Sequence, residues 1–264
     1  MNSATNNTVT NNTGMTWLRS SFWISVVSAR RLLFTWQSAI CLAILAVLSL
    51  LSLLWRLNAG EEAKDFVEFI LTTIFVSIFL PLAALCFGTA GIGRERDSKT
   101  LVYLVSTPTP RPIVYYAKFV AMLAVTMLWT CGGYLVLLAS AGIIEAKVVM
   151  GYLPTIILGS FAYVALFQLM SVVIRFATIV SFLYIIFFES LVGNIPGTTK
   201  RVTVSFYVKC LILDASETLG FERENGGVDM FQAISGGNAT LVLIFGGLVL
   251  ILLGSLIFWR KEYV

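Results

Sequence analysis

The sequence predicts an all-α polytopic membrane protein with six transmembrane helices, an N-terminal interfacial helix, a short cytoplasmic helix and an outer cap. Of its 264 residues, 58% are hydrophobic and only 12% are charged, whereas soluble domains are about 25% charged. The mean hydropathy is +0.89. Several apolar runs also reach the length of about 20 residues that a membrane-crossing helix needs. We therefore expect a single transmembrane domain over residues 16–264.

The N-terminal region divides into a polar tail and an amphipathic segment. Residues 1–15 are rich in Asn and Thr and contain no Lys or Arg, so they lack the charged start of a secretory signal and are predicted to be disordered. The next segment, Trp17–Trp36, mixes aromatic and aliphatic residues with Arg19, Arg30 and Arg31. This mixture indicates an interfacial helix on the cytoplasmic leaflet. The alternative is a simple extension of the first span.

Six apolar segments are predicted to span the bilayer, at residues 37–55, 69–91, 114–141, 148–174, 176–193 and 239–259. The fourth and fifth form one nearly continuous run, Val148–Gly193. As one helix, that run would be about 69 Å long, more than twice the hydrocarbon thickness of about 30 Å. Arg175 lies in its middle and would cost about 2.5–3.5 kcal/mol at the bilayer centre. A turn at Arg175 removes that cost and divides the run into two spans.

The Lys and Arg residues of the short loops predict the orientation, because cytoplasmic loops are enriched in both. With the N-terminus in the cytoplasm, that side carries eleven of them: Arg19, Arg30, Arg31, Arg94, Arg96, Lys99, Arg111, Lys118, Arg175, Arg260 and Lys261. The opposite side, leaving aside the long final loop, carries three: Arg56, Lys64 and Lys147. Both termini are therefore expected in the cytoplasm.

The long final loop, Asn194–Asn238, predicts the outer cap. A loop of this length usually has a function, and Val202–Leu213 is apolar but too short to span. We expect this segment to fold back as an interfacial or re-entrant helix. The cap is expected to be anchored by Glu189, near the outer interface, and by the turn at Asn194, Pro196 and Gly197. Acids inside membranes are also often functional, which is the alternative for Glu189.

Gln168 is the notable polar residue of the fourth predicted span. Its amide would either hydrogen-bond across helices or line a substrate path, and helix packing is the favoured role.

Several kinds of chemistry have no basis in the sequence. There is no histidine, and the four cysteines are scattered without metal-ligand spacing, so neither a metal site nor a nucleophilic catalytic set is predicted. The chain also lacks the GxxxxGK[ST] motif of a phosphate loop. We expect no enzyme activity, no cofactor and no nucleic-acid partner for this chain.

A charged segment between the second and third predicted spans is the strongest functional signal. It reads Gly-Arg-Glu-Arg-Asp-Ser-Lys-Thr from Gly93, followed by a short apolar stretch and Pro108. Asp97 or Ser98 is expected to cap a helix whose apolar side carries Leu101 and Leu104. Such a helix fits a groove on a soluble partner. The alternative is ordinary cytoplasmic charge beside a proline-stopped turn.

These residues resemble the first cytoplasmic loop of ABC-2 type permeases, the membrane subunits of ATP-binding-cassette exporters. The family pattern is roughly E-R-E-x-G-T, a few apolar residues, L-[ST]-[ST]-P, a basic or polar residue, and a Lys at the start of the third span. Here it reads Glu95-Arg96-Asp97-Ser98-Lys99-Thr100, then Leu101 to Val105, Ser106-Thr107-Pro108, Arg111 and Lys118. Asp97 stands where Glu is usual and Lys99 where Gly is usual. A second similarity is Glu189 followed by Asn194-Ile195-Pro196-Gly197.

The resemblance implies a coupling helix that contacts a separately encoded ATPase. On this chain the contact is assigned to Arg94, Glu95, Arg96, Asp97, Lys99, Thr100, Leu101, Leu104 and Pro108. It further implies two ATPase copies that hold ATP and Mg, a second permease copy, surrounding lipids, and a plasma membrane, such as a bacterial inner membrane. The expected function is ATP-driven export. A stand-alone channel or secondary carrier, and a scaffold that recruits a soluble protein, are the alternatives, and the sequence does not identify the cargo.

Overall fold

The computed structural model describes residues 21–59, 66–97, 110–143, 145–191, 199–219 and 234–260. Within these ranges the regular elements are all helices. They are α2 (Trp36–Ala59), η1 (Phe66–Phe79), α4 (Leu80–Asp97), α6 (Arg111–Ala141), α7 (Ala146–Val173), α8 (Ala177–Tyr184), η2 (Ile185–Leu191), η4 (Thr199–Val202), α9 (Val204–Thr218) and α10 (Gly236–Arg260). Residues 21–33 form a further helix before α2. The predicted all-α class is confirmed.

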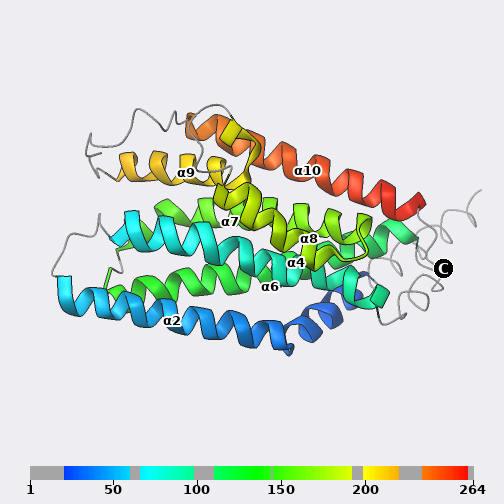
Figure 1. The fold of residues 1–264 in the computed structure, drawn as a ribbon, viewed down its shortest axis with the longest axis horizontal. Coiled ribbons are helices and arrows are strands. Elements are labelled where there is room, and N and C mark those ends of the chain that lie inside the picture. The colour runs from blue at the N-terminus through cyan, green and yellow to red at the C-terminus, as the bar shows by residue number, and fades with distance from the viewer. Residues whose placement is uncertain are drawn as a thin grey trace, which may run out of the picture.

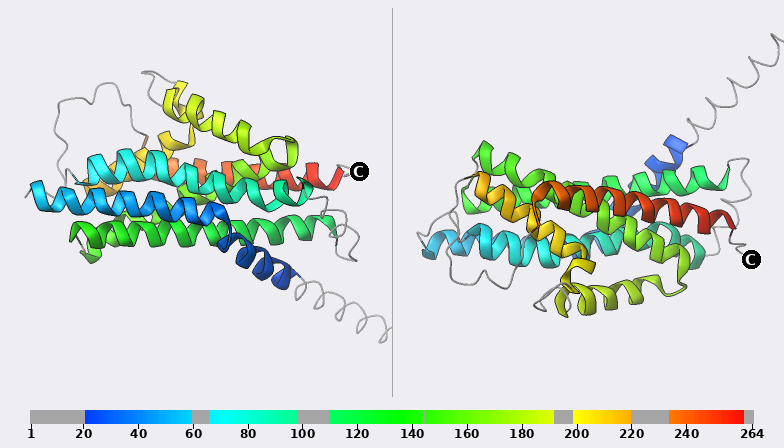
Figure 2. Two further views of the ribbon diagram at one scale, coloured as in Figure 1. Left: turned by 60° about the horizontal axis from the view of Figure 1, so that its bottom comes forward. Right: turned by 90° about the horizontal axis from the view of Figure 1, so that it is seen from above.

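The long helices lie side by side in an elongated bundle (Figure 1). Helix α7 lies at its centre and contacts α4, α6, α8, α9 and α10. The end of α10 lies at the end of the bundle where α4 ends and α6 begins, and the N-terminal helix that precedes α2 extends toward the same end (Figures 1 and 2). We refer to this end as the α4–α6 end.

Within the described part of the chain, five helices are long and apolar enough to cross a membrane. They cover Trp36–Leu57, Phe69–Gly93, Pro112–Ala141, Ala146–Val173 and Gly236–Arg260, and correspond to five of the six predicted spans. The predicted turn at Arg175 is confirmed, since α7 ends at Val173 and α8 begins at Ala177. At the other end of α7, Gly142 closes the α6–α7 turn with a φ of 79°, a left-handed conformation that glycine adopts without strain.

The predicted span at 176–193 is not confirmed as a single crossing helix. Its apolar helix, Ala177–Glu189, has 13 residues and is about 20 Å long, less than the hydrocarbon thickness of about 30 Å. Helix α8 continues into the π-helix η2, which ends near the middle of the bundle, and α9 then runs from the middle to the far end (Figure 1). The chain therefore follows the length of the bundle here in two separate helical pieces, α8 with η2 and then α9.

The segment Val202–Leu213 contains the helix that the sequence predicts, because α9 covers Val204–Thr218. This helix packs against α7, α10 and η1, and its residues Phe206, Val208 and Ile212 are buried. It is thus part of the bundle. An outer cap over a substrate exit stays a prediction, and residues 220–233 lie outside the described part of the chain.

The N-terminal helix, residues 21–33, is separated from α2 by a break at Phe34 and Thr35. The Thr35 hydroxyl donates to the Leu32 carbonyl at 2.7 Å, and the Ser38 hydroxyl donates to the same carbonyl at 3.0 Å. These bonds satisfy the end of one helix beside the start of the next. A straight extension of the first span is therefore wrong, and the interfacial depth of this helix stays a prediction.

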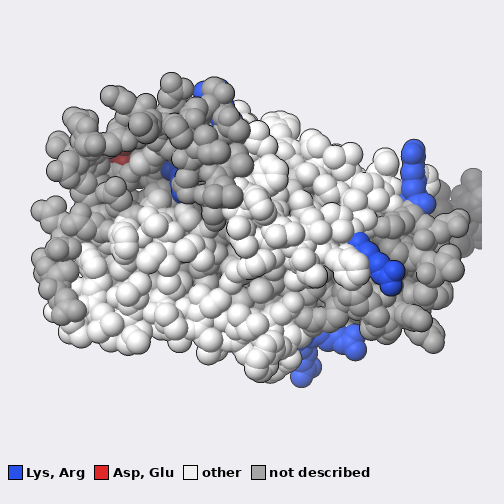
Figure 3. All heavy atoms as spheres, viewed as in Figure 1, with Lys and Arg blue, Asp and Glu red and all other residues white. Residues whose placement is uncertain are grey.

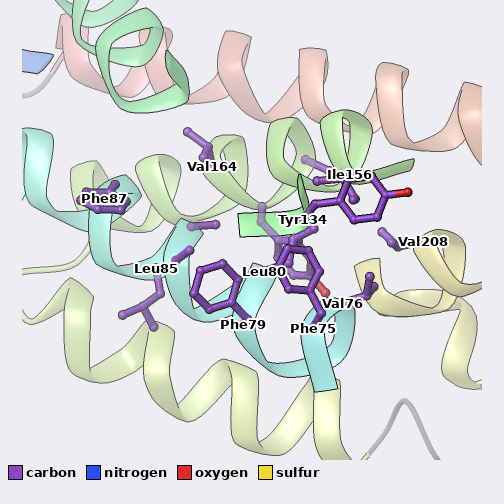
Figure 4. Packing of buried hydrophobic residues seen from close by; sticks show 14 of the residues in the cluster. Phe75, Val76, Phe79, Leu80, Leu85, Phe87, Tyr134, Ile156, Val164 and Val208 are labelled. Carbon is purple, nitrogen blue, oxygen red and sulfur yellow. The ribbon is translucent and has the colours of Figure 1, made fainter. Parts of the chain in front are cut away.

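The core contains large aromatic and aliphatic side chains from η1, α4, α6, α7 and α9 (Figure 4). Phe75 and Phe79 stack with ring centroids 5.1 Å apart, and Tyr134 packs against Phe75. Ile156 of α7 and Val208 of α9 join the same cluster. Because α9 shares this core, its position depends on the main bundle.

The outer surfaces of α2 and α10 remain largely apolar. In the most apolar 18-residue stretch of each helix, only 22% of α2 and 33% of α10 is buried, against 61% of α7. On the face drawn in Figure 3, the side of the bundle is almost free of charge, and several Lys and Arg side chains lie near the α4–α6 end. The exposed arginines include Arg30, Arg31, Arg175 and Arg260.

The glycines of α10 allow a first test of this packing. A Cβ at Gly254 would meet the hydroxyl of buried Tyr115, whereas a Cβ at Gly246 would meet nothing within 4 Å. Gly254→Ala should cost about 1–3 kcal/mol through overpacking and lower the thermal midpoint of the detergent-solubilised protein by several degrees. Gly246→Ala is the matched control and should leave the midpoint unchanged or raised, since Ala favours helix. Equal midpoints for the two variants would contradict the α6–α10 contact.

Candidate functional site

The charged segment begins as the last turn of α4. This helix runs through Asp97, so Arg94, Glu95, Arg96 and Asp97 extend α4 instead of starting a new helix. Asp97 is therefore not the predicted N-cap, because residues 94–97 contain no Gly or Pro to stop α4 and Arg and Glu are good helix formers. The alternative N-cap, Ser98, lies outside the described residues. Lys99, Thr100, Leu101, Leu104 and Pro108 lie outside the described residues, so the coupling helix stays a prediction.

Helix α6 begins at Arg111, after the apolar stretch and Pro108 that follow the charged segment. Pro110 precedes it with a φ of −58°, and Pro112 occupies its first turn, where a missing N–H does no harm. Two turns further on, Lys118 is only 2% exposed. Its Nζ donates a hydrogen bond to the Gly91 carbonyl of α4 at 3.1 Å. A buried cation therefore joins the first turns of α6 to the last turns of α4.

The end of α4 is also bound to the α7–α8 hairpin. The Ser171 hydroxyl of α7 donates to the Thr89 carbonyl at 3.2 Å, and the Thr178 hydroxyl of α8 donates to the Thr89 hydroxyl at 3.3 Å. Gly91 and Thr89 are neighbours on α4. A displacement of the charged segment would therefore act on α6 and on the α7–α8 hairpin together.

Gln168 is completely buried in α7. Its Nε2 donates to the Tyr115 carbonyl of α6 at 3.3 Å, which is the interhelical bond that the sequence favours. Lining of a substrate path by Gln168 stays a prediction.

Glu189 lies deep in the bundle, not near the outer interface as the sequence suggests. The carboxylate is 5% exposed and lies beside Tyr163, which is ten residues before the end of α7 at Val173. At 1.5 Å per residue, that is about 15 Å along the helix, close to half the hydrocarbon thickness. The sequence estimate fails because η2 ends in mid-bundle.

The Glu189 carboxylate joins η2 to the start of α9. Its Oε2 accepts the backbone N–H of Ser205 at 3.0 Å, while Thr203, the residue before α9, makes no side-chain cap. Glu189 thus caps a helix N-terminus from a different element, a position that favours negative charge. Its Oε1 accepts the Tyr184 hydroxyl at 3.3 Å.

Two further residues complete this site, and the sequence analysis did not identify either. Lys209 of α9 is electrostatically attracted to Glu189, and the Tyr163 hydroxyl of α7 lies beside Glu189 and Ser205. Ser205 and Lys209 are four residues apart, so they lie on the same face of a helix. This spacing is visible in the sequence. We call Glu189, Tyr163, Tyr184, Ser205 and Lys209 the Glu189 joint. Asn194, Pro196 and Gly197 lie outside the described residues, so their anchoring role stays a prediction.

Metal chemistry has no candidate here. Among the described residues, no group of three or more Cys, Asp or Glu side chains is placed to hold a metal ion.

Comparison with known families settles the class of protein. The profile of the ABC-2 family transporter proteins matches residues 21–262, almost the whole chain. The chain belongs to the ABC-2 transporter family. The match includes every helix described above, and it confirms the resemblance noted in the charged segment. No match was found among curated proteins.

Membership defines the general role of the ABC-2 chain as a multi-pass membrane component of a transport system. Among the described residues, the buried charged side chains are Lys118, at the α4–α6 end, and Glu189, in the Glu189 joint. The first lies beside the charged segment. The second lies at the break between η2 and α9.

Proposed function

We propose that this permease is the membrane subunit of an ATP-driven exporter, and that it pairs with a separately encoded ABC ATPase. The observation that carries the proposal is the family match over residues 21–262, combined with the charged sequence that leaves α4 and precedes α6. ATP and Mg bind to the partner, and this chain holds no cofactor. Its own part is mechanical.

The contacts of α4 support a route for that mechanical step. Movement of the ATPase displaces the segment that begins at Arg94, and α4 moves with it. Because Lys118 bonds to Gly91 and Ser171 bonds to Thr89, α6 and the α7–α8 hairpin follow. The ATP-bound ATPase shifts the permease only if it binds one conformation of the permease better than the other. The contact with the charged segment supplies this difference in binding.

A second permease copy completes the pathway. The outer face of α8 and η2 is apolar and exposed, including Phe182, Phe187 and Phe188, and this helix pair ends in mid-bundle. A broken helix within the hydrocarbon is tolerated only where protein or a water-filled cavity covers its backbone. Packing of a second copy along this face would meet that requirement. The apolar composition of the spans favours an amphipathic, lipid-like or peptide cargo.

The function can be tested by reconstitution with a candidate ABC ATPase sought among the neighbouring genes. The two proteins should purify together from a membrane extract, and ATP turnover in nanodiscs should differ from that of the ATPase alone. Export is then measured as ATP-dependent uptake of a fluorescent amphiphile into inverted vesicles. Failure to co-purify, with unchanged turnover, would reject the exporter assignment.

The orientation makes a separate prediction. Single cysteines introduced by Ser98→Cys and Phe176→Cys should react only with a membrane-impermeant maleimide applied from the cytoplasm, because the Lys and Arg asymmetry places both turns there. Glu222→Cys should react only from outside. Each is placed in a background without the four native cysteines. Labelling of Phe176→Cys from outside would show that the α7–α8 turn is on the opposite side.

A further inference from the structure

The N-terminal helix, residues 21–33, is held to the bundle by one of its faces. The Ser25 hydroxyl donates a hydrogen bond to the Ala117 carbonyl of α6 at 2.8 Å, and Leu32 is only 5% exposed. Ala29 also packs against the core. Because Ser25, Ala29 and Leu32 are spaced four and three residues apart, they lie on one face of the helix. The opposite face is left for another partner.

The outward face of this helix combines apolar and basic side chains. Its exposed members are Phe22, Trp23, Val26, Val27, Arg30, Arg31 and Phe34. Trp36, at the start of α2, is 81% exposed and extends the set. The exposed positions recur in every turn of the helix, so they form one continuous surface. We call these residues the 22–36 stripe, and an exposed apolar patch of this kind marks an interaction surface.

The start of α2 indicates where the 22–36 stripe meets the membrane. The apolar span of α2 begins at Trp36, and Arg31 stands five positions earlier. At 1.5 Å per residue, that separation is at most about 7.5 Å. The polar layer on each side of the hydrocarbon is about 5–7 Å thick. The N-terminal helix leaves the line of α2 at an angle (Figure 2), so we expect Arg30 and Arg31 within reach of the lipid phosphates.

We propose that the 22–36 stripe is a binding surface for an anionic phospholipid. Arg30 and Arg31 hold the headgroup phosphate, and the aromatic side chains lie beside the glycerol and the acyl chains. The planar guanidinium group suits this role, because it offers a phosphate two parallel hydrogen bonds. Tryptophan is likewise enriched at the boundary between headgroups and hydrocarbon.

The charge of the stripe favours an anionic lipid over a zwitterionic one. Two adjacent arginines bring two positive charges to one point of the membrane surface. A phosphatidylcholine headgroup carries its own cation, which repels them, whereas a phosphatidylglycerol headgroup carries an uncompensated negative charge. An acidic soluble protein would also attract the arginines. It would have to cover Phe22, Trp23 and Trp36 beside the bilayer, where lipid already solvates them, so the stripe fits a lipid better.

A lipid on the outward face also supports the contact on the inward face. The Ser25 hydroxyl binds the carbonyl of Ala117, the residue before Lys118 in α6. A headgroup that holds Arg30 and Arg31 in place restrains the whole helix, and with it this hydrogen bond. Two consequences can be measured: a preference of the protein for anionic lipid, and slower amide exchange in the helix when that lipid is present.

The preference is measured by native mass spectrometry of the purified full-length permease. The protein is titrated with phosphatidylglycerol and, separately, with phosphatidylcholine of the same acyl chains. The unmodified permease should bind phosphatidylglycerol about tenfold more tightly, and Arg30→Gln with Arg31→Gln should reduce the preference to about twofold or less. Gel filtration and a thermal melt establish that the variant is folded, which is expected because both arginines are exposed.

The matched control removes two other exposed arginines. Arg175→Gln with Arg260→Gln changes the net charge equally, but these residues come from the α7–α8 turn and the end of α10. The preference of this control should stay within about twofold of the unmodified permease, since the two residues do not belong to the stripe. In nanodiscs, amides of residues 22–33 should exchange about threefold more slowly with phosphatidylglycerol than with phosphatidylcholine, and the Arg30 and Arg31 variant should lose this difference.

Three results would overturn the lipid site. The first is an unchanged lipid preference after Arg30 and Arg31 are replaced. The second is an equal loss in the Arg175 and Arg260 control, which would make the preference a general effect of positive charge. The third is an unchanged preference combined with loss of ATPase co-purification, which would assign the stripe to an acidic protein. The lipid measurements need neither ATPase nor cargo, so their failure would leave the exporter proposal standing.

Discussion

Replacing Glu95 and Asp97 together with alanine is expected to abolish coupling to the ATPase. Both residues belong to the last turn of α4, at the end of the bundle where they have no role in crossing the membrane. Truncating one partner of a buried charge pair at an interface costs about 2–5 kcal/mol. Loss of two such groups should weaken association with the ATPase by about a hundredfold or more.

This result is measured with the reconstituted complex. Co-purification of the ATPase should be lost, and ATP turnover should return to the rate of the ATPase alone. The double variant itself should insert and dimerise normally. Glu61→Ala with Glu62→Ala is the matched control, since it removes the same charge from the sequence between α2 and η1. Normal association of the Glu95 and Asp97 variant would show that the ATPase docks elsewhere.

The long spans could be predicted because length and hydropathy are properties of contiguous residues. The five helices that cross the bundle agree with the apolar runs, and Arg175 identified the α7–α8 turn because a single arginine is costly within hydrocarbon. These signals need no knowledge of which helices touch. They describe a chain in a membrane and do not depend on the packing of this particular bundle.

The break between η2 and α9 could not be predicted from length and hydropathy. The apolar residues continue from α8 through η2, so composition does not reveal where the helix ends. The sequence assigns the α9 segment to an outer loop because its apolar run, Val202–Leu213, is too short to span and contains Lys209. The compensating group is Glu189, 20 positions before Lys209, and only the folded chain brings the two together.

The same reason explains which site residues were found. Glu189 stands out as an acid in apolar sequence, and intramembrane charges are often functional. From the sequence, Lys118 is only a cytoplasmic basic residue and the Lys of the family pattern. Tyr163 is one tyrosine among nine, and nothing in its neighbours distinguishes it. Its importance comes from its position beside a carboxylate on another element. Thr89 is similar, since its bonds to Ser171 and Thr178 join residues more than 80 positions apart.

Lys118→Met should separate coupling from stability. Lys118 is buried in the bundle, and its hydrogen bond to the Gly91 carbonyl joins α6 to α4. Methionine has a similar length and flexibility but carries no charge, so the variant relieves the desolvation of a buried ammonium, which can exceed what its contacts contribute. We expect the melting temperature of the purified permease to stay the same or rise.

Coupling should change in the opposite direction. A hydrogen bond to a charged group contributes about 1.5–3 kcal/mol, so its loss should reduce the permease-dependent change in ATP turnover by about tenfold. Thr126→Val is the matched control: Thr126 is buried in the same helix, and its hydroxyl donates to the Met122 carbonyl of α6 itself. This control should leave coupling intact.

A Lys118→Met permease that couples normally would show that the α4–α6 contact does not transmit the movement of the ATPase. A variant that loses stability and coupling together would instead make Lys118 a structural residue, because a positioning role requires the folded state to survive while the response to ATP is lost.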